Sequence, residues 1–285
     1  MIQCTIRFSG ITVRFHVPDG TQFHEEMLSL RCEDAEPDEE FTIRLLDKPL
    51  NPVGSVLYSN SGITEYETDA GRLRIYHALV ETDGCQVACL LCPDGKNIMY
   101  YPASRWAFYA SPLRLIHLIM PELLLMRHDG FLLHSSVVGY RGTSLLFSGA
   151  SGAGKSTQAA LWEKYMGADV VNGDRCLIRK IDGRFFGGGS PWSGTSGIYH
   201  SEFYPISAVV LPYKASENRI SPMGAVAFPL LLAQTVVNHW NSPFMEKLTQ
   251  MYSELMVRVP VYRLDCRPDE EAVRLVHRTV FGKDE

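Results

Sequence analysis

The stretch from Phe147 to Thr157 restricts the fold of this chain more than any other part of the sequence. It reads FSGASGAGKST, and its residues 149–156 fit the pattern G-x4-G-K-[ST]. The apolar residues SLLFS precede the pattern and the helix-favouring residues STQAALWEKYM follow it. This is the strand, loop and helix context that the pattern requires. The sequence therefore predicts an α/β arrangement around this loop.

The glycines of this loop predict a phosphate-binding site. They let the backbone curl so that successive N–H groups point inward, and the N-terminus of the following helix adds the positive end of its dipole. Lys155 would reach the β- and γ-phosphates, Ser156 would bind Mg2+, and Thr157 would contact the α-phosphate. The predicted nucleotide-binding residues are Gly149, Ser151, Gly152, Ala153, Gly154, Lys155, Ser156 and Thr157.

An acidic residue and a histidine lie on either side of this loop in the sequence. VVNGDRCLI places Asp174 after a short apolar run that follows the predicted helix, residues 155–166. A carboxylate at a strand end is the metal partner that phosphoryl transfer needs. FLLHSSVV places His134 on the apolar segment before the loop's strand. Taken alone, a histidine on a strand is more often a hydrogen-bonded core residue than a ligand.

Together, the segments LHSSVV, LLFSGASGAGKST and VVNGDRCLI resemble the HPr kinase/phosphorylase family and, more distantly, ATP-dependent phosphoenolpyruvate carboxykinase. The resemblance covers about residues 131 to 180. It implies that His134 lies near the metal or the transferred phosphate, and that Lys155 and Ser156 bind phosphate and Mg2+. It also implies that Asp174 contacts the metal. The candidate catalytic residues are therefore Lys155, Asp174 and His134, and the candidate metal ligands are Ser156 and Asp174.

Gly173 departs from the pattern of those families. They carry two adjacent Asp residues where this chain has Gly173-Asp174, and the first Asp is associated with accepting the proton of the acceptor hydroxyl. Glycine has no side chain that can act as a base. Either Asp174 or His134 takes over this role, or transfer is slow or absent. Positioning and charge neutralisation dominate phosphoryl transfer, so kinase activity stays compatible with this sequence.

A glycine-rich segment after Asp174 is a candidate substrate loop. Residues 187–197 read GGGSPWSGTSG, which is too rich in glycine for the interior of an element and too long for a hairpin turn. It would close over the acceptor, with Trp192 covering an apolar part of the substrate. The alternative is a flexible connection anchored by a buried Trp. HPr-kinase-related proteins carry a similar PWSG segment. The predicted substrate-loop residues are Gly189, Trp192, Ser193 and Gly194.

The remaining sequence falls into two regions. Up to about residue 105, short alternating runs such as CTIRF, FTIRLL and CQVACLL are separated by turn residues, which is typical of β-strands. LRLIHLIMPELLLMRHDG has helical spacing, and Pro121 is expected to kink or divide it. Strand and helix signals then alternate up to a closing helix in residues 268–281. We predict an α/β fold, α+β overall, with a β-rich module at 1–105 and a P-loop domain of the HPr kinase/phosphoenolpyruvate carboxykinase type at 106–285.

Three cysteines raise one alternative. Cys85, Cys89 and Cys92 have the C-x3-C-x2-C spacing with which radical-SAM enzymes hold a [4Fe-4S] cluster. They lie, however, in an apolar run that ends at a Pro-Asp-Gly turn, which indicates a β-hairpin. Strand alternation puts Cys85 and Cys89 on one face and Cys92 on the other, so a buried strand is favoured over a cluster. The odd total of seven cysteines, in a chain without a secretion signal, indicates free thiols.

Composition excludes several other classes of protein. A net charge of -5 provides no basic field for nucleic acid or an anionic membrane surface. No window approaches the roughly 18 uncharged apolar residues that span a bilayer, and MIQCTIRFSG lacks the features of a signal peptide. We therefore expect a cytoplasmic protein that binds neither nucleic acid nor membrane. The sequence allows a homo-oligomer.

These observations predict an enzyme, an ATP- and Mg2+-dependent kinase that acts on a hydroxyl. If the HPr kinase resemblance sets the analogy, the acceptor is a Ser or Thr of a protein or modified peptide, although a fold analogy does not name a substrate. Two alternatives stay open. One is a nucleotide-binding accessory or regulatory protein with weak or lost transfer. The other is a kinase for a small molecule.

Overall fold

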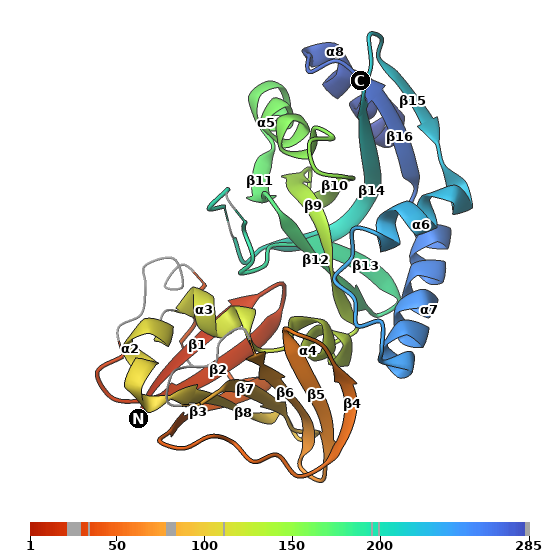
Figure 1. The fold of residues 1–285 in the computed structure, drawn as a ribbon. Coiled ribbons are helices and arrows are strands. Elements are labelled where there is room, and N and C mark those ends of the chain that lie inside the picture. Colours follow the sequence, from red (N-terminus) through yellow and green to blue (C-terminus); the bar gives the residue numbers. More distant parts are fainter. Residues whose placement is uncertain are drawn as a thin grey trace. The chain divides into compact units, whose positions relative to one another are not determined.

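The computed structural model describes residues 1–21, 30–33, 35–77, 84–110, 112–194, 196–198 and 200–282 (Figure 1). It divides into two compact units. One comprises Met1–Arg7 and Ile11–Leu124, and the other comprises Phe8–Gly10 and Leu125–Glu285. Each unit contains a large β-sheet and helices, so the fold is mixed α/β. The predicted division at 105/106 falls inside the first unit, before its last helices.

The first unit is built on one eight-stranded sheet. Its strands are β1 (Ile2–Phe8), β2 (Ile11–Val17), β3 (Glu39–Leu46), β4 (Ser55–Ser59), β5 (Ile63–Thr68), β6 (Gly71–Tyr76), β7 (Val87–Leu91) and β8 (Lys96–Pro102). Their order is β1-β2-β3-β8-β7-β6-β5-β4. The pairs β2–β3 and β3–β8 are parallel, whereas β4 to β8 pair antiparallel along the chain. Leu73, Ile75, Ala88 and Leu90 form a buried cluster on this sheet.

Short helices follow this sheet, namely η2 (Ala103–Arg105), α2 (Trp106–Tyr109), α3 (Pro112–His117) and α4 (Pro121–Arg127). Pro121 begins α4 and so divides the predicted helical stretch, because the first position of a helix needs no N–H donor. A buried ionic group joins α4 to the sheet. Arg74 of β6 donates to Glu65 of β5 at 3.1 and 2.8 Å and also to Glu122 of α4.

The three cysteines lie at the predicted hairpin of β7 and β8. Cys85 and Cys89 are buried and Cys92 is half-buried. All seven cysteines of the chain are free thiols. Within the described ranges, no three His, Cys, Asp or Glu side chains are grouped to hold a metal ion. The predicted hairpin and the buried strand are confirmed for Cys89, whereas Cys85 and Cys92 lie just outside β7.

The second unit contains another eight-stranded sheet. Its strands are β9 (Gly130–Tyr140), β10 (Thr143–Ser148), β11 (Asp169–Asn172), β12 (Arg175–Ile181), β13 (Arg184–Gly188), β14 (Phe203–Lys214), β15 (Arg219–Pro222) and β16 (Val261–Cys266). The order is β10-β9-β12-β13-β14-β16-β15, and β11 pairs with β9. β10 also pairs in parallel with β14, which in turn pairs in parallel with β16.

The long strand β9 changes partners part of the way along its length. Residues 130–134 pair with β12, and residues 135–140 pair with β10. His134 and Ser135 therefore stand at the point where the ladder to β12 ends and the ladder to β10 begins. This change of partner is the feature of the fold that positions the site described below.

The helices of the second unit are α5 (Lys155–Met166), η3 (Gly224–Val226), α6 (Ala227–Leu232), α7 (Ser242–Arg258) and α8 (Glu270–Phe281). α5 has the predicted bounds, and α5 and α8 cover the sheet through a buried cluster that includes Trp162, Phe147 and Val276. α7 is not among the elements predicted from the sequence, although it has an apolar face at helical spacing, formed by Phe244, Leu248, Met251, Tyr252 and Leu255. No helix in the described part of the chain is long and apolar enough to cross a membrane.

Candidate functional site

The glycine-rich loop joins the carboxyl end of β10 to the first residue of α5. Gly149, Gly152 and Gly154 have φ angles of 146°, 76° and 106°, a backbone region that L side chains rarely adopt. The loop therefore needs glycine at these three positions. β10 lies between β9 and β14, so the loop leaves the sheet between two paired neighbours.

The N-terminus of α5 differs from those of α7 and α8. Asn241 caps α7 and Asp269 caps α8 with a side-chain oxygen, whereas no described side chain caps α5 at Gly154. The first backbone N–H groups of a helix have no partner within the helix. Those of α5 are consequently available to an anion, which the helix dipole attracts. Ser156 and Thr157 are exposed on this first turn.

Lys155 folds back over its own loop. It is only 7% exposed, and its Nζ donates hydrogen bonds to the carbonyl oxygens of Gly149 at 2.9 Å and Ala150 at 3.1 Å. Burial lowers the pKa of Lys155, and the negative charge of Asp174 opposes that shift. A buried ammonium held by carbonyl groups can exchange these partners for phosphate oxygens, which bind it more strongly because they are charged.

Strand register brings the predicted residues from the two sides of the loop together. Ser148, the last residue of β10, pairs with Ser135, and Arg175, the first residue of β12, pairs with His134. The Ser148 Oγ donates to the His134 carbonyl at 3.0 Å, and the Ser135 N–H donates to the Asp174 carbonyl at 2.9 Å. His134 and Asp174 thus lie beside the strand end from which the glycine-rich loop leaves.

His134 and Asp174 form an ion-pair geometry at this point. The Nε2 of His134 lies 3.2 Å from Oδ1 of Asp174, and the Nε of Arg175 lies 3.5 Å from Oδ2. Burial and the positive charge of Lys155 lower the pKa of His134, while Asp174 and a hydrogen bond to Gln234 oppose that shift. The imidazole therefore favours its neutral form, which can accept a proton.

A cavity of about 230 Å³ opens on this pair of side chains. It is lined by His134, Asp174, Arg175, Ala233, Gln234, Thr235 and Val236. The side chain of His134 is 37% exposed and that of Asp174 is 29% exposed. A hydroxyl group on another molecule can reach both.

Asn172 holds the backbone of the turn that carries Asp174, and it is not among the site residues predicted from the sequence. This side chain is fully buried. Its Oδ1 accepts hydrogen bonds from the N–H groups of Asp174 at 2.9 Å and Arg175 at 2.8 Å, and its Nδ2 donates to the Ser190 carbonyl at 3.1 Å. The Asn-Gly-Asp sequence is a turn-forming pattern that could have indicated this role.

The glycine-rich segment packs directly on the same turn. A Cβ added at Gly173 would lie 2.4 Å from Oγ and 2.5 Å from Cβ of Ser196. Gly194 has a φ of 58°, and a Cβ there would lie 2.6 Å from Cγ of Asp174. Ser196 thus fills the space in which a side chain at position 173 would begin. This packing leaves no room for a carboxylate side chain at position 173.

The glycine-rich segment begins later than we predicted. Gly187 and Gly188 belong to β13 and pair with β12, so our assignment of these two residues to a loop was wrong. These positions of β13 need glycine because neighbouring residues leave no room for a side chain. A Cβ at Gly188 would lie 2.3 Å from Cβ of Phe203. Further along, Trp192 and Ser193 are buried, at 2% and 7% exposure. This is the placement expected for a Trp that anchors the segment.

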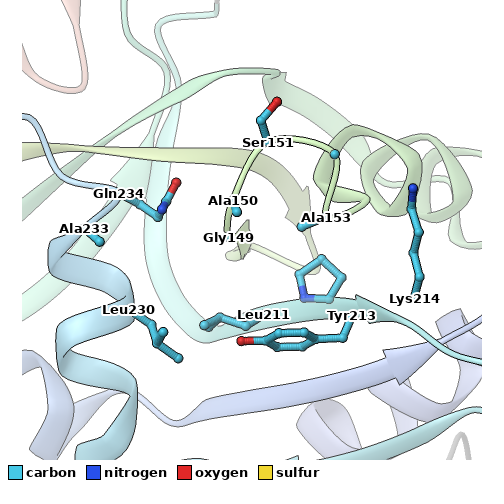
Figure 2. Close-up of a pocket in the computed structure, with 12 residues that line it drawn as sticks. Gly149, Ala150, Ser151, Ala153, Leu211, Tyr213, Lys214, Leu230, Ala233 and Gln234 are labelled. Carbon is cyan, nitrogen blue, oxygen red and sulfur yellow. The ribbon is translucent and has the colours of Figure 1, made fainter.

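A larger cavity, of about 490 Å³, borders the loop on the side of β14 (Figure 2). Gly149 to Ala153 form one wall, and the end of β14 from Leu211 to Lys214 forms another. Figure 2 shows Leu230, Leu211 and the Tyr213 ring along the side facing the loop. Ala233 and Gln234 line both this cavity and the one at Asp174, so the two adjoin.

Comparison with solved structures shows a distant structural likeness. The HPr(Ser) kinase/phosphatase from Coxiella burnetii matches with a TM-score of 0.31 and 11% sequence identity, over 52% of this chain and 94% of the other. No protein-family model matches the sequence, and no curated protein matches it either.

Proposed function

We propose that the second unit binds ATP with Mg2+ and transfers the γ-phosphate to a hydroxyl group. One observation carries the proposal: the uncapped start of α5, buried Lys155 and the His134–Asp174 pair meet at the carboxyl end of β10. Hydrogen-bond donors that can bind phosphate, a cation and a carboxylate lie together here, and phosphoryl transfer uses all three.

The loop and the first turn of α5 would hold the phosphates. Backbone N–H groups would donate to the phosphate oxygens, and Lys155 would exchange its carbonyl partners for them. Ser156 and Asp174 would hold Mg2+, with phosphate oxygens and water as its remaining ligands, because this ion prefers few protein ligands and keeps several waters. An ion held by these two residues would neutralise the charge that develops on the phosphate oxygens.

Asp174 and neutral His134 line the cavity of about 230 Å³, which would hold the acceptor, and both can act as bases. The acceptor oxygen forms a bond to the γ-phosphorus as the bond from that phosphorus to the leaving ADP oxygen breaks. Oδ1 of Asp174 and Nε2 of His134 lie 3.2 Å apart, so the hydroxyl proton lost by the acceptor would be taken up by one of these two groups. This arrangement supplies a base without a carboxylate at position 173.

The accessibility of this pair supports an acceptor hydroxyl on a large molecule. His134 is more than one-third exposed, so Ser or Thr of a protein or modified peptide can approach it. A cytoplasmic location would supply ATP and such acceptors. A small-molecule acceptor would use the same cavity and the same two bases.

Transfer of labelled γ-phosphate from ATP tests the proposal. The acceptors would be a Ser/Thr peptide mixture and, separately, a mixture of free amino acids and sugars. The native chain should label an acceptor, and Lys155→Ala and Asp174→Asn should each reduce the rate about a hundredfold or more, since each removes a charge that acts in the transition state. Gln250→Ala, an exposed change on α7, serves as the control. No labelling by a native chain that binds ATP would contradict the transfer step.

The packing at Gly173 favours one second candidate, a nucleotide-controlled accessory protein. Ser196 occupies the space beside Gly173, so the glycine-rich segment lies against Asp174 rather than away from it. Binding of ATP would then change the position of this segment and its affinity for a partner. Tight ATP binding without transfer or hydrolysis is the result that this candidate predicts.

A further inference from the structure

We infer that a separate cavity at the carboxyl ends of β14 and β16 binds the nucleoside of the nucleotide, and that Gln158 gives it a preference for adenine. The inference rests on the proposed function. The cavity measures about 280 Å³ and is bounded by Thr157 and Gln158 of α5, Pro212 and Lys214 of β14, and Cys266 of β16. Ala215 and Pro268, which follow the two strands, also line it.

The strand order sets the direction in which a nucleotide lies. β9 and β14 are the two neighbours of β10, and the His134–Asp174 pair stands on the side of β9. A triphosphate held by the loop with its γ-phosphate at Asp174 therefore extends toward β14. Ligands of open α/β sheets bind in the crevice at the carboxyl ends of parallel strands, and β10, β14 and β16 are mutually parallel in this order.

The first turn of α5 leads into this cavity. Thr157 follows the predicted Mg2+ ligand Ser156 and lines the cavity together with Ala153 and Gly154. These residues belong to the part of the loop that would hold the α- and β-phosphates. A ribose attached to the α-phosphate would therefore enter at Thr157, and the base would lie between Lys214 and Pro268.

Gln158 provides the observation that points to a base with an amino group. Its side chain is 2% exposed, and its Nε2 donates to Sγ of Cys266 at 3.4 Å. Its Oε1 has no hydrogen-bond partner among the described residues, although buried polar atoms are nearly always paired. With Nε2 held by Sγ of Cys266, this oxygen is the amide atom left to accept a hydrogen bond from a bound base.

Adenine and guanine differ at the group that meets such an acceptor. Adenine carries an amino donor at C6, and guanine carries a carbonyl acceptor there. An acceptor oxygen at Gln158 favours the first and repels the second. The larger cavity shown in Figure 2 lacks a comparable buried and unpaired side chain within the described ranges, so we place the base in the smaller one.

Calorimetric titration with three ligands tests the nucleoside site. Mg2+ complexes of ATP, GTP and inorganic tripolyphosphate would be titrated into the native chain, Ala215→Leu and Leu230→Trp. Ala215→Leu fills the proposed cavity and should weaken ATP binding about tenfold or more. The affinity for tripolyphosphate should change less than about twofold. Leu230→Trp enlarges a residue of the larger cavity only and should leave ATP binding unchanged.

The base preference has its own variant. The native chain should bind ATP about tenfold more tightly than GTP, the equivalent of one hydrogen bond to a buried group. Gln158→Met keeps the length of the side chain without its polar atoms, and it should bring the two affinities within about twofold of each other. A circular dichroism spectrum and an unchanged tripolyphosphate affinity would show that this variant still folds.

The three ligands separate failure of this inference from failure of the proposed function. Two results would contradict the nucleoside site while leaving phosphate binding by the loop intact. One is that tripolyphosphate binds as tightly as ATP, and the other is that Leu230→Trp, and not Ala215→Leu, weakens ATP binding. Equal affinity for ATP and GTP in the native chain contradicts the role of Gln158. If neither ATP nor tripolyphosphate binds, both the site and the proposed function fail.

Discussion

At the scale of single residues, the site balances one carboxylate against three cationic or proton-accepting groups. Asp174 contacts His134 and Arg175 directly, and its charge acts on the buried Lys155. Lys155 and Arg175 both disfavour a proton on His134, whereas Asp174 favours it. The protonation of His134 therefore reports on the charges of its neighbours.

The pKa of His134 provides the test of this balance. We expect its imidazole to titrate below the ordinary value for histidine, because burial and Lys155 disfavour the charged ring. Lys155→Met removes a positive charge and should raise this pKa, whereas Asp174→Asn removes a negative charge and should lower it. Proton NMR of the imidazole resonance against pH measures both shifts, with His134→Gln to assign the signal. Shifts of the same sign in the two variants would contradict the balance.

At the scale of elements, the site depends on two connections that lie against each other. The turn between β11 and β12 carries Asp174, and the segment after β13 packs on this turn through Gly194 and Ser196. Asn172 ties the two together by bonding both the turn and the Ser190 carbonyl. The acidic turn and the glycine-rich segment therefore pack together, although β12 and β13 separate them in the sequence.

Gly173→Ala tests this packing. The added Cβ would meet Ser196 at 2.4 Å, and we expect it to lower the free energy of unfolding by about 1–3 kcal/mol, the usual effect of overpacking. Urea unfolding of the single variant and of Gly173→Ala with Ser196→Gly measures the effect. The double variant should recover most of the lost stability because it removes the obstructing side chain. Equal stability of the single and double variants would show that Ser196 does not occupy this space.

At the scale of the whole molecule, the two units have different kinds of interior. The second unit buries an aromatic and aliphatic cluster between α5, α8 and the sheet. The first unit buries charge as well. Arg74 stands between Glu65 and Glu122, and Glu65 is completely buried. Such a group needs all its members, since a buried charge without a partner costs several kcal/mol.

Arg74→Met tests this dependence in the first unit. The change removes the guanidinium that lies between the buried carboxylates of Glu65 and Glu122, and we expect it to lower the free energy of unfolding by about 3–5 kcal/mol. Urea unfolding monitored by circular dichroism gives the value. Arg274→Met on α8 removes an exposed ion pair with Glu270 and should change stability by about 1 kcal/mol or less. Similar losses in the two variants would contradict the buried role of Arg74.

Local sequence signals predicted several elements, of which α5 carries part of the site. The alternation of CQVACLL, the position of Pro121 and the glycine pattern before Lys155 each act over a few residues, and β7, α4 and α5 follow from them. The same reasoning failed at Gly187 and Gly188, where close neighbours from other strands make glycine necessary within β13. Local preference cannot show such neighbours, because they come from distant parts of the chain.

By itself, the amino-acid sequence determined a glycine-rich loop between a strand and a helix. It also predicts which residues of that loop would bind phosphate, because such a loop has the same local geometry wherever it occurs. The sequence did not determine which residues from other parts of the chain lie beside that loop. The change of partners along β9 placed His134 beside Asp174, and the packing of Ser196 on Gly173 closed the space next to them. Both arise from pairings between segments far apart in the chain, which form only when the whole sheet is assembled.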